Sequence, residues 1–144
     1  IHCVQDNQAR SVYGVLRGLH YQNDPHAQTS LIRVLEGEII DVVVDLRQGS
    51  PLFGKSFSIL LSAENKKQLL VPKGFAHGYA VVSPTAEVLY KCDEFYHKEQ
   101  EGGIRYNDPS LGIDWGIPLD EAIVSEKDQL QPLLADAVPG FVFG

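Results

Sequence analysis

The sequence predicts an all-β protein, an antiparallel sandwich or barrel of jelly-roll type. Short runs of alternating or β-branched residues recur along the chain, with turns rich in Gly, Pro and Asn between them. Apolar residues almost never repeat with the roughly 3.6-residue period of a helix. The 144 residues suffice for one domain with a sizeable core, so we expect residues 1–144 to form a single jelly-roll domain.

The clearest strands lie in the centre of the chain. Residues 31–46, LIRVLEGEIIDVVVDL, place β-branched residues on both sides of a Glu-Gly-Glu turn, which predicts a hairpin. A second hairpin is expected from the alternating strand 55–61, the turn 63–67 and the strand 68–71. These four strands form the centre of the predicted fold.

Two more strands are expected at 79–83 and 87–96, on either side of a Ser-Pro-Thr turn. Beyond Gly102, closely spaced Pro and Gly residues predict an irregular segment that wraps the barrel. One short helix is expected there at 125–130, because Ser125 is a good N-cap residue.

Composition excludes several classes of function. A net charge of -7 argues against broad binding to nucleic acid or to an anionic membrane. No apolar run approaches the ~20 residues that span a bilayer, and the first residues lack a signal-peptide profile. Cys3 and Cys92 are too few for a disulfide scaffold and too far apart for a CxxC pair. We therefore expect a soluble, cytoplasmic protein.

Two segments, GVLRGLHYQ and PKGFAHGY, place a histidine among apolar residues and turn glycines. A lone histidine in such surroundings is more often structural than catalytic. Here His20 follows Arg17 and His77 follows Lys73, so each imidazole comes with a cation for a phosphate or a developing oxyanion. This arrangement favours proton abstraction from a carbon acid.

A metal site is disfavoured by the same segments. Gln22 occupies the position of a second ligand in an H-x-H pair with His20, and no second imidazole lies near His77 in the sequence. His26 and His97 lie among polar residues in predicted turns, and no role is assigned to them.

Two tyrosines, Tyr90 and Tyr96, share the predicted strand VLYKCDEFY at an even spacing. In a regular strand both would project from one face, where one could donate a proton and the other stack on a ring. The alternative is a pair of ordinary half-buried strand aromatics, which the spacing alone favours.

These segments, together with VQDN, GEIIDVVVDLRQGSPLFGK, EGGIRYNDPSLGIDW and SEKD, resemble the dTDP-4-dehydrorhamnose 3,5-epimerase family from about Val4 to Asp128. The resemblance implies a cupin-type double-stranded β-helix with a short irregular or helical C-terminal segment. It implies an isomerase of dTDP-rhamnose biosynthesis that inverts C3, C5 or both in a dTDP-4-keto-6-deoxyhexose. It also implies a dTDP-sugar substrate, a homodimer, and no metal or redox cofactor.

The resemblance assigns three catalytic roles. His20 corresponds to the base that removes the protons beside the C4 ketone, and Asp128 to the acid that orients this imidazole. Tyr90 corresponds to the acid that returns a proton from the opposite face. The binding residues implied are Gln5, Asp6, Asn7, Arg17, His77, Tyr96, Glu101 and Lys127, with Tyr96 stacked on the thymine base.

The chain departs from the family pattern at several points. Ser30 stands where a lysine usually stabilises the C4 oxyanion, and Ala9 stands where a serine is common. Family members also begin some tens of residues earlier, so the family's N-terminal segment is expected to be missing. The strand-like start at residues 1–4 is consistent with a sheet edge that needs a dimer partner.

Two alternatives to epimerisation stay open at this point. A related barrel with a similar histidine base is a sugar-nucleotide 3,4-ketoisomerase, which relocates the ketone. A paralog weakened by Ser30 and by the lack of the N-terminal segment would only bind the dTDP-sugar, because one oxyanion contact is worth ~10²–10³ in rate.

Overall fold

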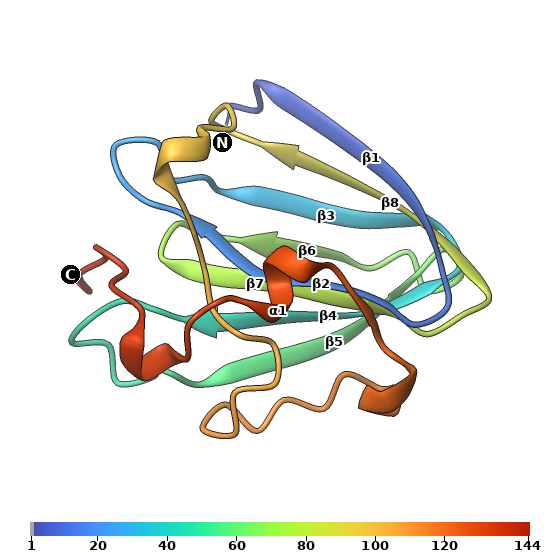
Figure 1. The fold of residues 1–144 in the computed structure, drawn as a ribbon. Coiled ribbons are helices and arrows are strands. Elements are labelled where there is room, and N and C mark those ends of the chain that lie inside the picture. The colour runs from blue at the N-terminus through green and yellow to red at the C-terminus, as the bar shows by residue number, and fades with distance from the viewer. Residues whose placement is uncertain (1) are drawn as a thin grey trace.

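The computed structural model describes residues 2–144 as a two-sheet β-sandwich (Figure 1). The strands are β1 Gln5–Val12, β2 Val15–Gln22, β3 Ser30–Glu36, β4 Glu38–Asp45, β5 Ser56–Ser62, β6 Gln68–Val71, β7 Phe75–Val81, β8 Thr85–Cys92, β9 Glu101–Gly103 and β10 Ile123–Val124. The helical elements are α1 Glu126–Gln129 and the 3₁₀ turns η1 Lys98–Gln100, η2 Leu119–Glu121 and η3 Leu134–Asp136. The all-β prediction is confirmed.

The smaller sheet has the order β1-β8-β3-β6, and the larger has the order β10-β2-β7-β4-β5, with β9 also paired to β2. From β1 to β8 the chain changes sheet at nearly every connection. Among residues 2–144, β4 and β5 are the only neighbours in that series that pair with each other. Such alternation between two sheets is the arrangement of a jelly roll.

Both predicted hairpins are wrong for this reason. β3 lies in the smaller sheet and β4 in the larger, so the Glu-Gly-Glu turn carries the chain from one sheet to the other. The single connecting residue, Gly37, has a φ of 78°, and a Cβ there would lie 2.0 Å from the carbonyl oxygen of Thr85. Tight hairpins use about two residues or more, so this connection is too short for one. β5 and β6 are separated in the same way, because β5 pairs with β4 and β6 with β3.

The ends of two predicted strands also differ. The strand expected at 87–96 ends at Cys92, because the Asp93 side chain accepts the Thr29 N–H at 2.7 Å and the chain leaves the ladder. The prediction that Tyr90 and Tyr96 share one strand face is therefore wrong. At the other end of the chain the first strand begins at Gln5, and Ile1 lies outside the described residues.

Two apolar cores follow from the alternation of side chains on the larger sheet. One lies between the sheets and includes Ile39, Val81 and Val88. The other lies on the outer face, where Val42 and Val44 pack under the segment that carries Ile104, Leu111, Trp115 and Phe141. The predicted irregular C-terminal segment thus wraps the larger sheet (Figure 1).

The predicted short helix is confirmed as α1. The Ser125 hydroxyl caps it by accepting the Asp128 N–H at 3.2 Å. Across residues 2–144, this and the other helical turns are far below the length and apolar character of a membrane-crossing helix.

Candidate active site

An open cavity of about 650 Å³ lies between the sheets. It is lined by many of the residues singled out from the sequence: Arg17, His20, Ser30, His77, Tyr90, Tyr96, Glu101, Lys127 and Asp128. They come from strands of both sheets, from the loop after β8 and from α1, so the fold gathers side chains that are far apart in the sequence. A cavity of this size fits a small-molecule ligand.

His20 and Asp128 form the first charged pair of this cavity. The His20 Nε2 atom lies 2.5 Å from Asp128 Oδ1, and the other carboxylate oxygen accepts the Gly18 N–H at 3.1 Å. Burial acts to raise the pKa of Asp128, but the hydrogen bond and charge of His20 outweigh it, so the pKa lies below its ordinary value. Asp128 therefore stays ionised at neutral pH and can stabilise a positive charge that forms on the His20 ring during a proton transfer.

A second histidine–carboxylate pair lies beside the first. β2 and β7 bring the Cα atoms of His20 and His77 into register, which places the two side chains next to each other. The His77 ring is paired with Asp41, which is fully buried on β4 and whose Oδ2 has no hydrogen-bond partner. No second imidazole lies near His77 in the sequence, but in the folded chain the His20 imidazole lies beside it.

Sequence reasoning missed Asp41. A signal was present, because an acid in the β-branched run IIDVVVD is unusual unless the side chain faces a polar partner. The alternation of β4 places Asp41 on the same face as Ile39 and Val43, toward the interior of the sandwich. Its partner could not be named without the strand register.

Close contact between two glycines shapes the strand that carries His20. A Cβ on Gly18, where φ is 125°, would lie 2.6 Å from the Gly78 Cα atom, and a Cβ on Gly78 would lie 2.6 Å from the Arg17 carbonyl oxygen. The β2–β7 register shifts between Arg17 and His20 at this point. The shift frees the Gly18 N–H to bind Asp128 instead of a strand partner.

Tyr90 lies on β8, in the sheet opposite to His20, and faces the same cavity. Burial raises the pKa of Tyr90 with support from Cys92, while Arg17 opposes the shift. The phenol is therefore protonated at neutral pH and can donate its proton. Tyr79, which the sequence did not single out, also lines the cavity, and burial raises its pKa in the same way.

Other predicted residues lie around the rim. Gln5 accepts the Tyr96 N–H at 3.0 Å and contacts Asn7, while Asp6 lies on the other side of β1, 2.9 Å from Lys91 Nζ. None of these three β1 residues lines the cavity.

Two further predicted residues, Lys127 and Glu101, form an ion pair, and both line the cavity. Ser30 lines it as well, with its hydroxyl 3.4 Å from Cys92 Sγ. The cavity therefore combines charged groups from the larger sheet and α1 with the hydroxyl groups of Ser30 and Tyr90 from the smaller sheet.

The cavity holds an imidazole–carboxylate pair beside one sheet and a protonated phenol on the other. These groups suit an enzyme that transfers protons. Isomerases that move protons at carbon form the class that this fold and site define.

Comparison with known proteins gives the particular family. Residues 1–136 match the family described as dTDP-4-dehydrorhamnose 3,5-epimerase. The enzyme of that name from Pseudomonas aeruginosa is 54% identical over 135 residues, which cover 93% of this chain and 73% of the relative. The crystal structure of the Elizabethkingia anophelis enzyme is 56% identical with a TM-score of 0.92, covering 94% of this chain and 74% of that one.

A third relative, from Legionella pneumophila, was solved in complex with dTDP-4-keto-L-rhamnose. It is 50% identical with a TM-score of 0.90 over 94% of this chain and 71% of its own. The chain belongs to the dTDP-4-dehydrorhamnose 3,5-epimerase family. The resemblance, the cupin-type fold and the isomerase class expected from the sequence are confirmed.

Proposed function

We propose that the protein inverts C3 and C5 of a dTDP-4-keto-6-deoxyhexose in dTDP-rhamnose biosynthesis, with His20 as the base and Tyr90 as the acid. The observation that carries this proposal is the placement of His20, paired with Asp128 of α1, and of Tyr90 on opposite sheets of one cavity. Inversion requires a proton to leave one face of a carbon and another to arrive on the opposite face.

The chemistry follows from the C4 ketone of the substrate. The hydrogens at C3 and C5 are acidic because the electron pair of each broken C–H bond moves onto the ketone oxygen as an enolate. His20 takes the proton, and the ionised Asp128 stabilises the imidazolium that forms. The Tyr90 O–H then supplies the proton of the new C–H bond on the other face, and exchange with water restores both groups.

This site has fewer groups than the family pattern to stabilise the negative charge that forms on the ketone oxygen. Ser30 supplies a neutral hydroxyl where the family pattern has a lysine, so Arg17 and His77 are the remaining groups for the oxyanion. One such contact is worth ~10²–10³ in rate, or about 2.7–4 kcal/mol. We therefore expect Ser30→Lys to raise kcat. An unchanged or lower kcat would show that the present groups already stabilise the enolate.

The nucleotide has its own candidate contacts at the open end of the cavity. Tyr96 lines the cavity with 51% of its surface exposed, and a flat exposed ring suits stacking on a base. Lys127 adds a cation for the diphosphate. The dTDP-keto-sugar held by the Legionella relative supports this ligand class.

Solvent exchange tests the proposal directly. The protein is incubated with the dTDP-4-keto-6-deoxyglucose substrate in D₂O, and NMR follows deuterium at C3 and C5. We expect deuterium at both carbons with inverted configuration. Absence of exchange would reject catalysis and leave a binding protein, and a relocated ketone would indicate a ketoisomerase instead.

We also propose a homodimer of single-domain subunits in a reducing compartment such as the cytoplasm. β1 is an edge strand of the smaller sheet and carries exposed Val12, which suits pairing with a partner. Both cores share the strands of one sandwich, and Cys3 and Cys92 are free thiols. Light scattering after size-exclusion chromatography tests the dimer, and a monomeric mass would exclude it.

A further inference from the structure

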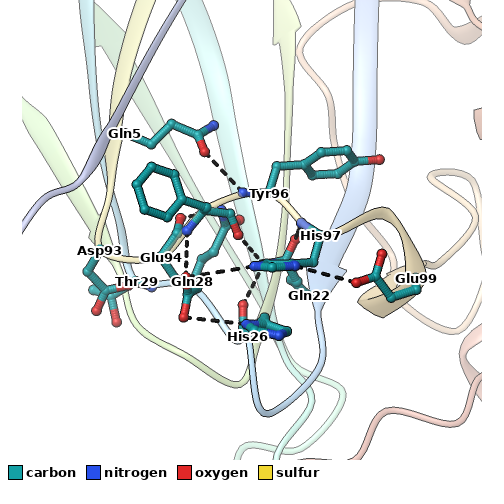
Figure 2. A network of polar contacts seen from close by, with 11 residues as sticks. Gln5, Gln22, His26, Gln28, Thr29, Asp93, Glu94, Tyr96, His97 and Glu99 are labelled. Carbon is teal, nitrogen blue, oxygen red and sulfur yellow. Dashed lines mark hydrogen bonds and ion pairs between the residues drawn. The ribbon is translucent and has the colours of Figure 1, made fainter.

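A second cluster of histidines lies outside the cavity, where the β2–β3 connection meets the loop after β8 (Figure 2). The rings of His26 and His97 are stacked, with centroids 3.5 Å apart and planes 15° from parallel. The Glu94 carboxylate lies beside both rings, with Oε2 3.5 Å from His26 Nδ1 and Oε1 4.0 Å from His97 Nε2. Neither histidine takes part in the proposed reaction.

One atom of this cluster has only a long polar contact. His26 Nδ1 is buried from solvent and makes no hydrogen bond, although the His26 side chain is 32% exposed as a whole. The Glu94 carboxylate pairs with this nitrogen at 3.5 Å, which is longer than a normal hydrogen bond, so the nitrogen is only weakly satisfied. A ligand atom placed between this nitrogen and the carboxylate would contact both more closely.

The three groups are spaced for a metal ion. One donor atom from each residue lies within 4.8 Å of the other two. Tetrahedral Zn²⁺ with bonds of about 2.0–2.2 Å places its ligand atoms roughly 3.3–3.5 Å apart. The distance from His26 Nδ1 to Glu94 Oε2 is 3.5 Å, while His97 Nε2 lies 4.0 Å from the other carboxylate oxygen, so His97 must move inward to complete the set. The rings must also tilt apart, because each nitrogen lone pair lies in its ring plane.

The Gln22 side chain fixes the backbone of both histidines and leaves their rings free to tilt. Gln22 Nε2 donates to the carbonyl oxygens of His26 and Phe95, at 2.5 and 2.9 Å, and its Oε1 accepts the His97 N–H at 2.9 Å. On the far side of the His97 ring, Nδ1 lies 3.4 Å from Glu99 Oε1 (Figure 2). A carboxylate in that position orients a metal-binding imidazole and raises its basicity.

We propose that His26, His97 and Glu94 bind a divalent transition-metal ion of the Zn²⁺ type, with Glu99 orienting the His97 ring and water completing the coordination. Two imidazoles and one carboxylate form a donor set that suits Zn²⁺ rather than Mg²⁺ or Ca²⁺. Bound there, the ion joins the β2–β3 connection to the loop that carries Tyr96. Its role is structural, and the proposal is independent of the chemistry in the cavity.

Zinc titration of the full chain tests the site. Calorimetry in chelator-free buffer above pH 7 measures the affinity, and NMR of the imidazole nitrogens reports which histidines respond. We expect one ion per chain, shifts at His26 Nδ1 and His97 Nε2, and a higher Tm. His97→Asn and Glu94→Gln should each weaken binding by about tenfold or more. His2→Gln, at an exposed histidine outside the cluster, should leave it unchanged.

Two results would overturn the proposal. One is an unchanged Zn²⁺ affinity in both His97→Asn and Glu94→Gln. The other is a set of imidazole shifts confined to His20 and His77, which would place the ion in the cavity instead. The metal-free NMR spectra of the variants establish that each is folded before the titration. Both changed side chains are about one-third exposed, so neither variant opens the core.

Discussion

The two faces of the larger sheet differ in kind although the same strands form them. On β4, Asp41 points into the sandwich toward His77, while the next residue, Val42, points outward into an apolar core under Trp115. Both residues are fully buried. The inner face holds charged pairs around a cavity beside apolar residues such as Ile39, whereas the outer face holds packed apolar side chains, so the pleat of a single strand separates the charged groups from the outer core.

This separation has an energetic basis. A buried carboxylate paired with an imidazole adds little net stability, because desolvation offsets much of the attraction. The outer face buries apolar groups, each worth about 0.8 kcal/mol per CH₂ removed from water. The wrapping C-terminal segment therefore stabilises strands whose inner face carries charged pairs that are costly to bury, and it also places Asp128 in the cavity.

The largest expected effect comes from the inner face. His20→Asn should lower kcat by about 10²–10⁴ while Tm changes little, because it removes the proposed base and keeps a polar group of similar size. Deuterium exchange at C3 and C5 measures the rate, and calorimetry measures Tm. His2→Gln is the control with wild-type exchange. Wild-type exchange in His20→Asn would place the base elsewhere.

Neighbouring substitutions on β4 test the two faces against each other. Asp41→Asn should lower kcat/KM by up to about 10²-fold, because a misplaced His77 no longer meets the substrate. Val42→Ala should leave kcat/KM nearly unchanged and lower the free energy of unfolding by about 2 kcal/mol through lost burial and a cavity. Kinetics and urea unfolding on both variants measure the contrast. A loss of activity in Val42→Ala and a loss of stability alone in Asp41→Asn would show that the two faces do not differ in this way.

A second acid on β4, Asp45, lies outside the cavity and stabilises the fold. Hydrogen bonds from Arg47, with help from Ser50 against the effect of burial, lower the pKa of Asp45 from 3.8 to about 2. The lowered folded-state pKa means that this stabilisation, about 2 kcal/mol, is complete above the unfolded value of 3.8 and is lost as pH falls through about 2.

Urea unfolding of the wild type and of Asp45→Asn between neutral and acid pH checks this prediction. The wild type should be the more stable protein at pH 7, and the difference should shrink as pH falls below about 4. Deuterium exchange should stay at the wild-type rate in the variant, because Asp45 does not line the cavity. A difference in stability that is constant with pH would contradict the assigned cause.

The smallest expected effect concerns the cap of α1. Ser125→Ala removes the acceptor of the Asp128 N–H and should cost about 1 kcal/mol of stability. Because the cap also fixes the residue that orients His20, a modest fall in kcat should accompany it. Ser125→Asp, which restores a capping acceptor, should recover both. Loss of stability without recovery in Ser125→Asp would argue against the cap.

Local features of the fold were readable from the sequence. The β-branched runs, the turns and the Ser125 cap depend on contacts between near neighbours in the chain, and each was predicted, as was the irregular course of the C-terminal segment. The two hairpin predictions were wrong because a glycine turn indicates only that the chain changes direction. Whether the next strand pairs with the last one or crosses to the other sheet depends on distant partners, as the contact between Gly37 and Thr85 shows.

The sequence by itself determined the strand content, the family motifs and the residue types for proton transfer: an imidazole, a carboxylate and a phenol. Tertiary structure alone decided which of them meet. The register of β2 and β7 placed His20 beside His77, the fold gave Asp41 its partner, and two loops brought His26 to His97. These contacts join residues far apart in the chain, and only the complete packing of both sheets fixes their distances.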